Sequence, residues 1–121
     1  MRRMARTIQP QAQGDDVHEA LHLLGHTVRA AIVHELRSGP LLGPELGHRL
    51  GLPSGTTGPH LVALRASGTI TSEIQPGHGR PVLHCLNTRR ADELTRLLAS
   101  YLMPQLLGSS PLTNGQRQQA P

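Results

Sequence analysis

The stretch GPELGHRLGLPSGTTGPHLVALRASGTI (residues 43–70) decides the fold, because it holds two short helical segments separated by a turn. The first segment, residues 43–50, opens with Pro44, which favours the first position of a helix. The second, residues 59–67, places leucines on one helical face. Two short helices joined by a tight glycine-containing turn are typical of a helix-turn-helix.

The joining segment PSGTTGPHL (residues 53–61) holds two glycines and two prolines, which raises the question of where its helix begins. A helix capped at Ser54 would place Pro59 in its interior, at a cost of about 3 kcal/mol. A later cap puts Pro59 in the first turn, where its missing N–H costs little. The candidates for that later cap are Thr56, Thr57 and Gly58. We therefore predict an extended turn over residues 53–57 and a short recognition helix over residues 58–67.

Two further helices are predicted before this motif. The first, DDVHEALHLL (residues 15–24), begins with two aspartates that suit a helix N-terminus and continues with apolar residues at helical spacing. The second, HTVRAAIVHELRS (residues 26–38), has the same periodicity, and Thr27 is its expected cap. Gly39 and the proline after it end that helix.

A β-hairpin and a long helix are predicted after the motif. Residues 69–74 and 82–86 alternate like strands around QPGHGRP, a loop of about seven residues. Residues 89–107 carry a continuous stripe of leucines until Pro104, which should end or kink the helix. The order α-α-α-α-β-β-α predicts a mainly α (α+β) winged helix-turn-helix. It occupies residues 15–107, between a disordered basic arm (1–14) and a disordered tail (108–121).

Over residues 21–87 the chain resembles the ArsR-type winged-helix repressors. The resemblance is carried by LLGHTVRAAIVHELRSGPL (23–41), by residues 45–70 and by GRPVLHCL (79–86). The positions that match the family pattern are Arg29, Ile32, Leu36, Glu45, Leu46, Leu50, Gly51, Leu52, His60, Leu61, Leu64, Arg65 and Gly68. The resemblance implies a homodimer that pairs through residues 15–24 and 89–107 and represses transcription. It also implies that a metal or another signal releases the DNA in many such proteins.

The expected partner is double-stranded DNA, and short polar side chains near the recognition helix are the candidates to contact it. They are Ser54, Thr56, Thr57 and His60, each of which can also be an ordinary turn or cap residue. In the wing, His78 and Arg80 are expected to contact DNA, since arginine suits a narrow minor groove. The alternative for the wing is a solvated turn. A flexible arm with Arg2, Arg3 and Arg6 could add phosphate contacts.

The sequence does not favour a metal site or a redox site. His18, His22 and His26 would share one helical face only if the first helix ran through Gly25, and no cysteine or carboxylate cluster completes a zinc site. We interpret these histidines as exposed polar residues and predict no metal and no cofactor. Cys85, the only cysteine, lies in a predicted strand and is interpreted as a buried structural thiol.

Composition narrows the function classes further. All 12 basic residues are arginine and the net charge is +4, which suits a polyanionic partner. No nucleophile elbow, phosphate-binding loop or paired carboxylates are present, so no enzyme is predicted. No apolar run is long enough to span a membrane, and a cytoplasmic protein is expected. The alternative function is a winged-helix module for protein–protein contact without base readout, because Pro59 stands where the family usually carries a polar or basic side chain.

Overall fold

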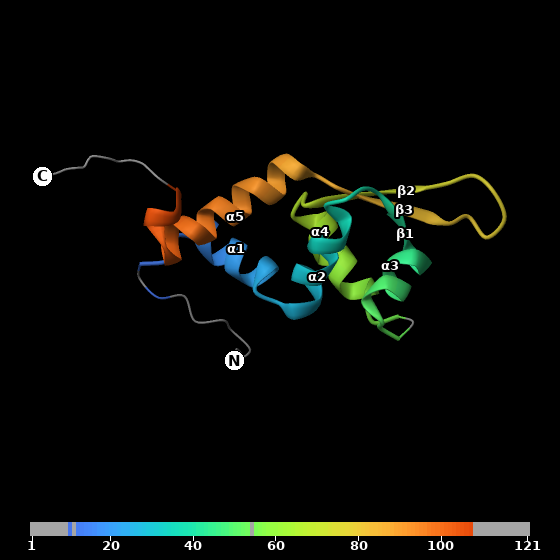
Figure 1. The fold of residues 1–121 in the computed structure, drawn as a ribbon, viewed down its shortest axis with the longest axis horizontal. Helices are drawn as coiled ribbons and strands as arrows, with labels where there is room; N and C mark the ends of the chain where they lie inside the picture. Colours follow the sequence, from blue (N-terminus) through green and yellow to red (C-terminus); the bar gives the residue numbers. More distant parts are fainter. Residues whose placement is uncertain (1–9, 11, 54, 108–121) are drawn as a thin grey trace, which may run out of the picture.

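The computed structural model describes residues 10, 12–53 and 55–107, and these form a helical body with a protruding hairpin (Figure 1). The predicted tail, most of the predicted arm and Ser54 lie outside the described residues. The elements in chain order are α1 (Asp15–Leu24), α2 (Thr27–Leu36), β1 (Leu41–Leu42), α3 (Gly43–Leu50), α4 (Gly58–Ala66), β2 (Ile70–Ile74), β3 (Val82–Leu86), α5 (Thr88–Leu102) and a 3₁₀ turn, η1 (Pro104–Leu107). The predicted winged helix-turn-helix is therefore confirmed.

The sheet has three antiparallel strands in the order β1-β3-β2. The hairpin pairs Ile70 with Leu86 and Ile74 with Val82, in the predicted position. β1 was not predicted, because a strand of two residues has no periodicity to detect. It becomes a strand only by pairing Leu41 with His84, which ties the start of α3 to the centre of the sheet.

The helix boundaries in the central motif follow from the backbone chemistry of a few residues. α3 ends at Gly51, whose φ of 65° lies in the left-handed region that glycine adopts without strain. α4 begins at Gly58 after Thr57, with Pro59 as its second residue, so the predicted late start is confirmed. One predicted cap is wrong: Thr27 is already helical, and the cap of α2 is His26.

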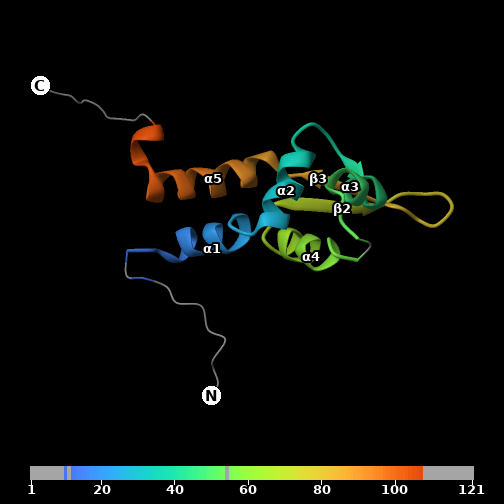
Figure 2. The same ribbon diagram turned by 60° about the horizontal axis from the view of Figure 1, so that its bottom comes forward.

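Two hydrophobic clusters hold the fold together. The larger lies under the helix-turn-helix and the sheet, and its buried members are Ile32, Leu36, Leu41, Leu46, Leu61, Leu64 and Ile70. The smaller joins α1 to α5 through Ala20, Leu23 and Leu94. In both ribbon views the α1–α5 pair and the hairpin loop lie at opposite ends of the molecule (Figures 1 and 2).

The C-terminal helix stops where the sequence predicts a break. α5 ends at Leu102, and Pro104 opens η1. Around this break Leu102, Met103 and Leu106 remain 60%, 44% and 69% exposed. Among the described residues, no helix is both long and apolar enough to cross a membrane.

Candidate nucleic-acid interface

The predicted contact residues fall into two separate groups. Thr56 and Thr57 lie half-buried in the turn before α4, and His60 follows in the first turn of that helix. His78 and Arg80 are exposed at the tip of the hairpin loop. The main-chain carbonyl of Thr57 accepts from Leu61 N–H at 2.9 Å, but its side chain makes no cap hydrogen bond. That hydroxyl is therefore not used in capping the helix.

His60 faces the protein more than the candidate interface. Its Nδ1 lies 3.1 Å from Nη1 of Arg29, and its ring centroid lies 4.3 Å from that of His26. Because arginine can only donate, Nδ1 of His60 must accept, which requires the neutral imidazole. Partial desolvation, His26 and Arg29 together lower the pKa of His60 below its usual 6.5. This side chain therefore positions the start of α4.

Arg29 links that start to the end of α1. Its Nη2 donates to the carbonyl of His22 at 2.7 Å, and its Nε donates to the carbonyl of Leu23 at 2.9 Å. Both carbonyls lie at the end of α1, where the helix itself supplies no N–H group to donate to its last carbonyls. In the sequence, Arg29 stands out only as a position that matches the family pattern. Its bridging role depends on contacts between elements that are distant in the sequence, so it could not be predicted.

The wing has an unusual backbone at its tip. Arg80 has a φ of 47°, and among the described residues it is the only non-glycine with positive φ. The neighbouring Gly77 and Gly79 also have positive φ, and Gln75 N–H donates to the carbonyl of Pro81 at 2.7 Å to close the loop. The turn therefore holds an exposed guanidinium at the far end of the hairpin.

The outward face of α4 is apolar, which the sequence analysis missed. Pro59, Val62 and Ala66 are exposed at positions i, i+3 and i+7, opposite the buried Leu61 and Leu64. Val62 is 56% exposed. The spacing of these three residues in the sequence was the available signal, although none of them carries a hydrogen-bonding side chain.

Beside this face, a polar chain fixes the side chain of Arg65. Its Nη1 donates to Oγ of Ser72 at 3.1 Å, and that hydroxyl lies 2.7 Å from Nδ1 of the buried His84. Burial, and to a smaller extent Arg65, lower the pKa of His84 below its usual 6.5, which favours the neutral imidazole. Arg65 is thus tied to both strands of the wing.

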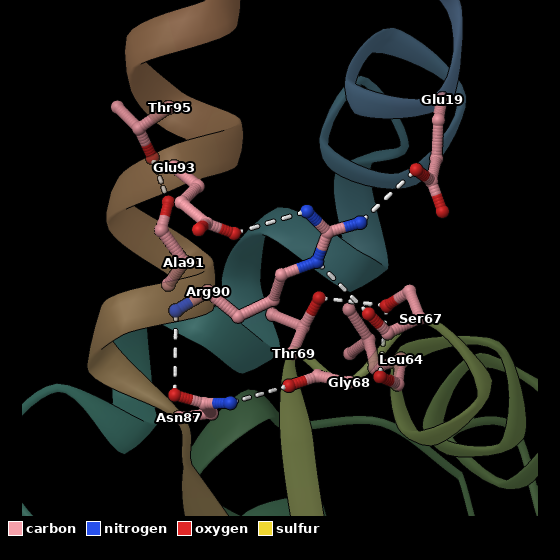
Figure 3. Close-up of polar contacts among 10 residues, drawn as sticks. All are labelled: Glu19, Leu64, Ser67, Gly68, Thr69, Asn87, Arg90, Ala91, Glu93 and Thr95. Atoms are coloured by element: carbon pink, nitrogen blue, oxygen red, sulfur yellow. Dashed lines mark hydrogen bonds and ion pairs between the residues drawn. The ribbon is translucent and has the colours of Figure 1, made fainter. Parts of the chain in front are cut away.

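The far end of α4 is held by a second arginine (Figure 3). Arg90 in α5 donates through Nε to the carbonyl of Ser67 at 3.0 Å, just past α4. The same guanidinium donates to Glu19 of α1 at 3.0 Å and to Glu93 of α5 at 3.2 Å. The hydrogen bond to Glu93 is the main cause that raises the pKa of Arg90, against partial desolvation. Arg29 and Arg90 thus connect both ends of α4 to α1 and α5.

Charge is divided between the two ends of the molecule. We call residues 26–87 the winged region, and residues 15–25 with 88–107 the helical region. The winged region holds five arginines against three glutamates, a net charge of +2. The helical region holds five acidic residues against three arginines, a net charge of −2. Of these two regions, the winged region is therefore the one whose charge favours a polyanion.

The histidines and the cysteine weighed as sites are placed apart. α1 ends at Leu24, so His26 does not continue the face of His18 and His22 and instead accepts from Val28 N–H at 3.1 Å. Within the part of the chain that the structure describes, no three His, Cys, Asp or Glu side chains gather as a metal-binding group. Cys85 lies in β3 and is only partly buried.

Solved structures share this fold. YodB from B. subtilis in a diamide-treated form has a TM-score of 0.64 at 16% identity, over 83% of this chain and 100% of that chain. The transcriptional repressor BigR from Xylella fastidiosa has a TM-score of 0.57 at 23% identity, over 79% of this chain and 90% of that chain. An ArsR family transcriptional regulator, RHA00566, has a TM-score of 0.59 at 20% identity, over 82% of this chain and 100% of that chain. No protein-family model and no curated protein matches the chain. The fold is that of ArsR-family winged-helix regulators, as the resemblance implied.

Proposed function

We propose that the chain is a sequence-specific regulator of transcription that binds double-stranded DNA. The observation that carries this proposal is the position of α4, whose outward face is free while its two ends are anchored by Arg29 and Arg90. A second helix presented in this way is the element that a helix-turn-helix inserts into a major groove. We also propose that the protein is not an enzyme and that it acts in the cytoplasm, where it would meet double-stranded DNA.

The proposed contacts come from both exposed groups. Thr56 and Thr57 lie at the start of α4, where their hydroxyls can meet phosphate or a base edge, and Ser54 is proposed for the same role from sequence alone. His78 and Arg80 at the wing tip are proposed to meet the backbone and the minor groove. His60 is proposed to act mainly by orienting α4, because it is engaged with Arg29.

We propose that the regulator works as a homodimer. The helical region has a small buried cluster, yet it exposes Leu102, Met103 and Leu106 around the end of α5. A second copy that packs α1 and α5 against their counterparts would cover these side chains and place two α4 helices for two half-sites. A repressor then acts by occupying a promoter.

The decisive experiment measures binding of the full chain to duplex DNA over a salt series. Affinity should fall steeply as salt rises, and selection from random duplexes should return a roughly palindromic site with half-sites about one helical turn apart. In transcription reactions on a promoter that carries this site, the protein should lower the yield of transcript. Absence of duplex binding at low salt would reject the proposal and favour the protein-contact alternative.

Arg80→Ala tests the wing, with Arg96→Ala as its matched control. Arg96 is also an exposed arginine, but it lies in the helical region and pairs with Asp92 at 2.9 Å. Arg80→Ala should weaken binding roughly tenfold and reduce the slope of log affinity against log salt by about one. Arg96→Ala, compared at a protein concentration at which its oligomeric state equals that of the wild type, should leave both unchanged. Equal effects of the two variants would remove the wing from the interface.

A further inference from the structure

The outward face of α4 has chemistry that narrows what it can recognise. Pro59, Val62 and Ala66 carry no side-chain hydrogen-bond donor or acceptor, and they form one stripe along the helix. In a major groove the bases display hydrogen-bonding groups and one apolar group, the C5-methyl of thymine. An apolar stripe can contact that methyl favourably, and it cannot hydrogen-bond to guanine, cytosine or adenine.

We propose that α4 reads thymine C5-methyl groups, with Val62 as the central contact. This inference rests on the proposed function and specifies the bases that the regulator would select. Val62 is 56% exposed although its helix neighbours Leu61 and Leu64 are buried, so its side chain has no role in the core. Small side chains at 59 and 66 allow the helix to approach the floor of a groove about 12 Å wide.

The charges around the stripe favour DNA over a protein as its occupant. Arg65 lies on the same helix and is held by Ser72, and the winged region has a net charge of +2. In addition, three small side chains are few compared with the roughly 20–30 residues that each side of a stable protein interface contributes. The stripe is thus suited to a partner whose affinity comes mainly from phosphate contacts.

The test uses the site selected from random duplexes by the full chain. Each thymine of the site is replaced in turn by deoxyuridine, which pairs identically and lacks only the methyl group. At one or more thymines in each half-site, wild-type affinity should fall about fourfold, the value expected for one buried methyl group. Thymines outside the half-sites serve as the control.

A variant identifies the side chain that meets the methyl. Val62→Ala should fold normally, because the side chain is exposed, and its thermal unfolding checks this point. At the sensitive thymine its loss on replacement by deoxyuridine should shrink to less than about twofold. On the duplex that carries thymine at the same position, only the wild-type protein should bind with full wild-type affinity.

The outcomes separate the two proposals. If the protein binds duplex DNA in a salt-dependent way but no thymine responds, methyl reading is wrong and the regulator remains. The same conclusion follows if Val62→Ala leaves every thymine effect unchanged. If selection returns no preferred sequence, both methyl reading and sequence-specific regulation are rejected. If no duplex binds at low salt, the regulator itself is rejected.

Discussion

The winged region and the helical region differ in how completely each is built. The winged region has its own cluster of seven buried apolar residues and a positive net charge. The helical region has a cluster of only three buried apolar residues, a negative net charge and exposed apolar side chains at its end. The winged region therefore has the larger core, while the helical region leaves apolar side chains exposed that the proposed second subunit would cover.

The largest expected effect comes from the two cores. Leu64→Ala and Leu94→Ala each remove a fully buried side chain, and each should lower the free energy of unfolding by about 2–5 kcal/mol. Only Leu94→Ala should also weaken the dependence of the unfolding temperature on protein concentration, because it loosens the region that is proposed to be dimeric and a weaker dimer is stabilised less by added protein. Urea unfolding measures the free energies, and thermal unfolding at two protein concentrations measures the concentration dependence. If the two variants showed the same concentration dependence, the proposed difference between the regions would be wrong.

The next effect concerns self-association. Leu102→Glu combined with Leu106→Glu should raise the dissociation constant of the dimer by at least roughly tenfold, since a buried unpaired charge is costly. Ile74→Glu is the control, because Ile74 is as exposed as Leu102 but lies in the winged region. Analytical ultracentrifugation measures both. A wild-type chain that is monomeric at high concentration would contradict the dimer.

A smaller effect is expected where the two regions meet. Arg90→Gln should lower the free energy of unfolding by about 1–2 kcal/mol. The ion pairs with Glu19 and Glu93 contribute little because both carboxylates are partly exposed, whereas the carbonyl of Ser67 loses its hydrogen-bond donor. Arg96→Gln removes an exposed pair within α5 and should cost less than about 0.5 kcal/mol. Chemical denaturation measures both variants. Equal costs would mean that Arg90 does not join the regions.

The smallest effect is a dependence of stability on pH in the winged region. The pKa values of His60 and His84 are lowered in the folded chain, so the folded state binds fewer protons than the unfolded state. Stability should therefore be complete above about pH 6.5 and decrease as the pH falls below that value. His84→Gln should flatten this decrease, as thermal unfolding between pH 5 and pH 8 would show. A wild-type stability that rises on acidification would contradict it.

Local signals predicted most of the fold. The late start of α4 followed from Pro59 alone, and the end of α5 followed from Pro104, because proline acts on the backbone where it stands. β1 was beyond prediction, since Leu41 and Leu42 are extended only because β3 lies beside them. The cap of α2 was misassigned because a histidine ring nitrogen can accept from the backbone as a hydroxyl can.

The candidate interface was less predictable than the fold. The position of Arg80 in an exposed turn could be predicted from turn chemistry, which is local, whereas its contact with DNA stays a prediction. The engagement of His60 by Arg29 depends on residues 31 positions apart in the sequence, so no pattern within the recognition helix could reveal it. Arg90 was missed for the same reason, because two of its partners, Ser67 and Glu19, lie 23 and 71 positions away in the sequence.

The backbone of Arg80 has a consequence for how this protein would respond to selection. A non-glycine residue in the left-handed region costs roughly 1–2 kcal/mol, and asparagine or glycine would relieve that cost. Directed evolution for heat resistance alone should therefore discard this arginine early. Selection for repression should keep it, so stability and activity at this one codon would be traded against each other.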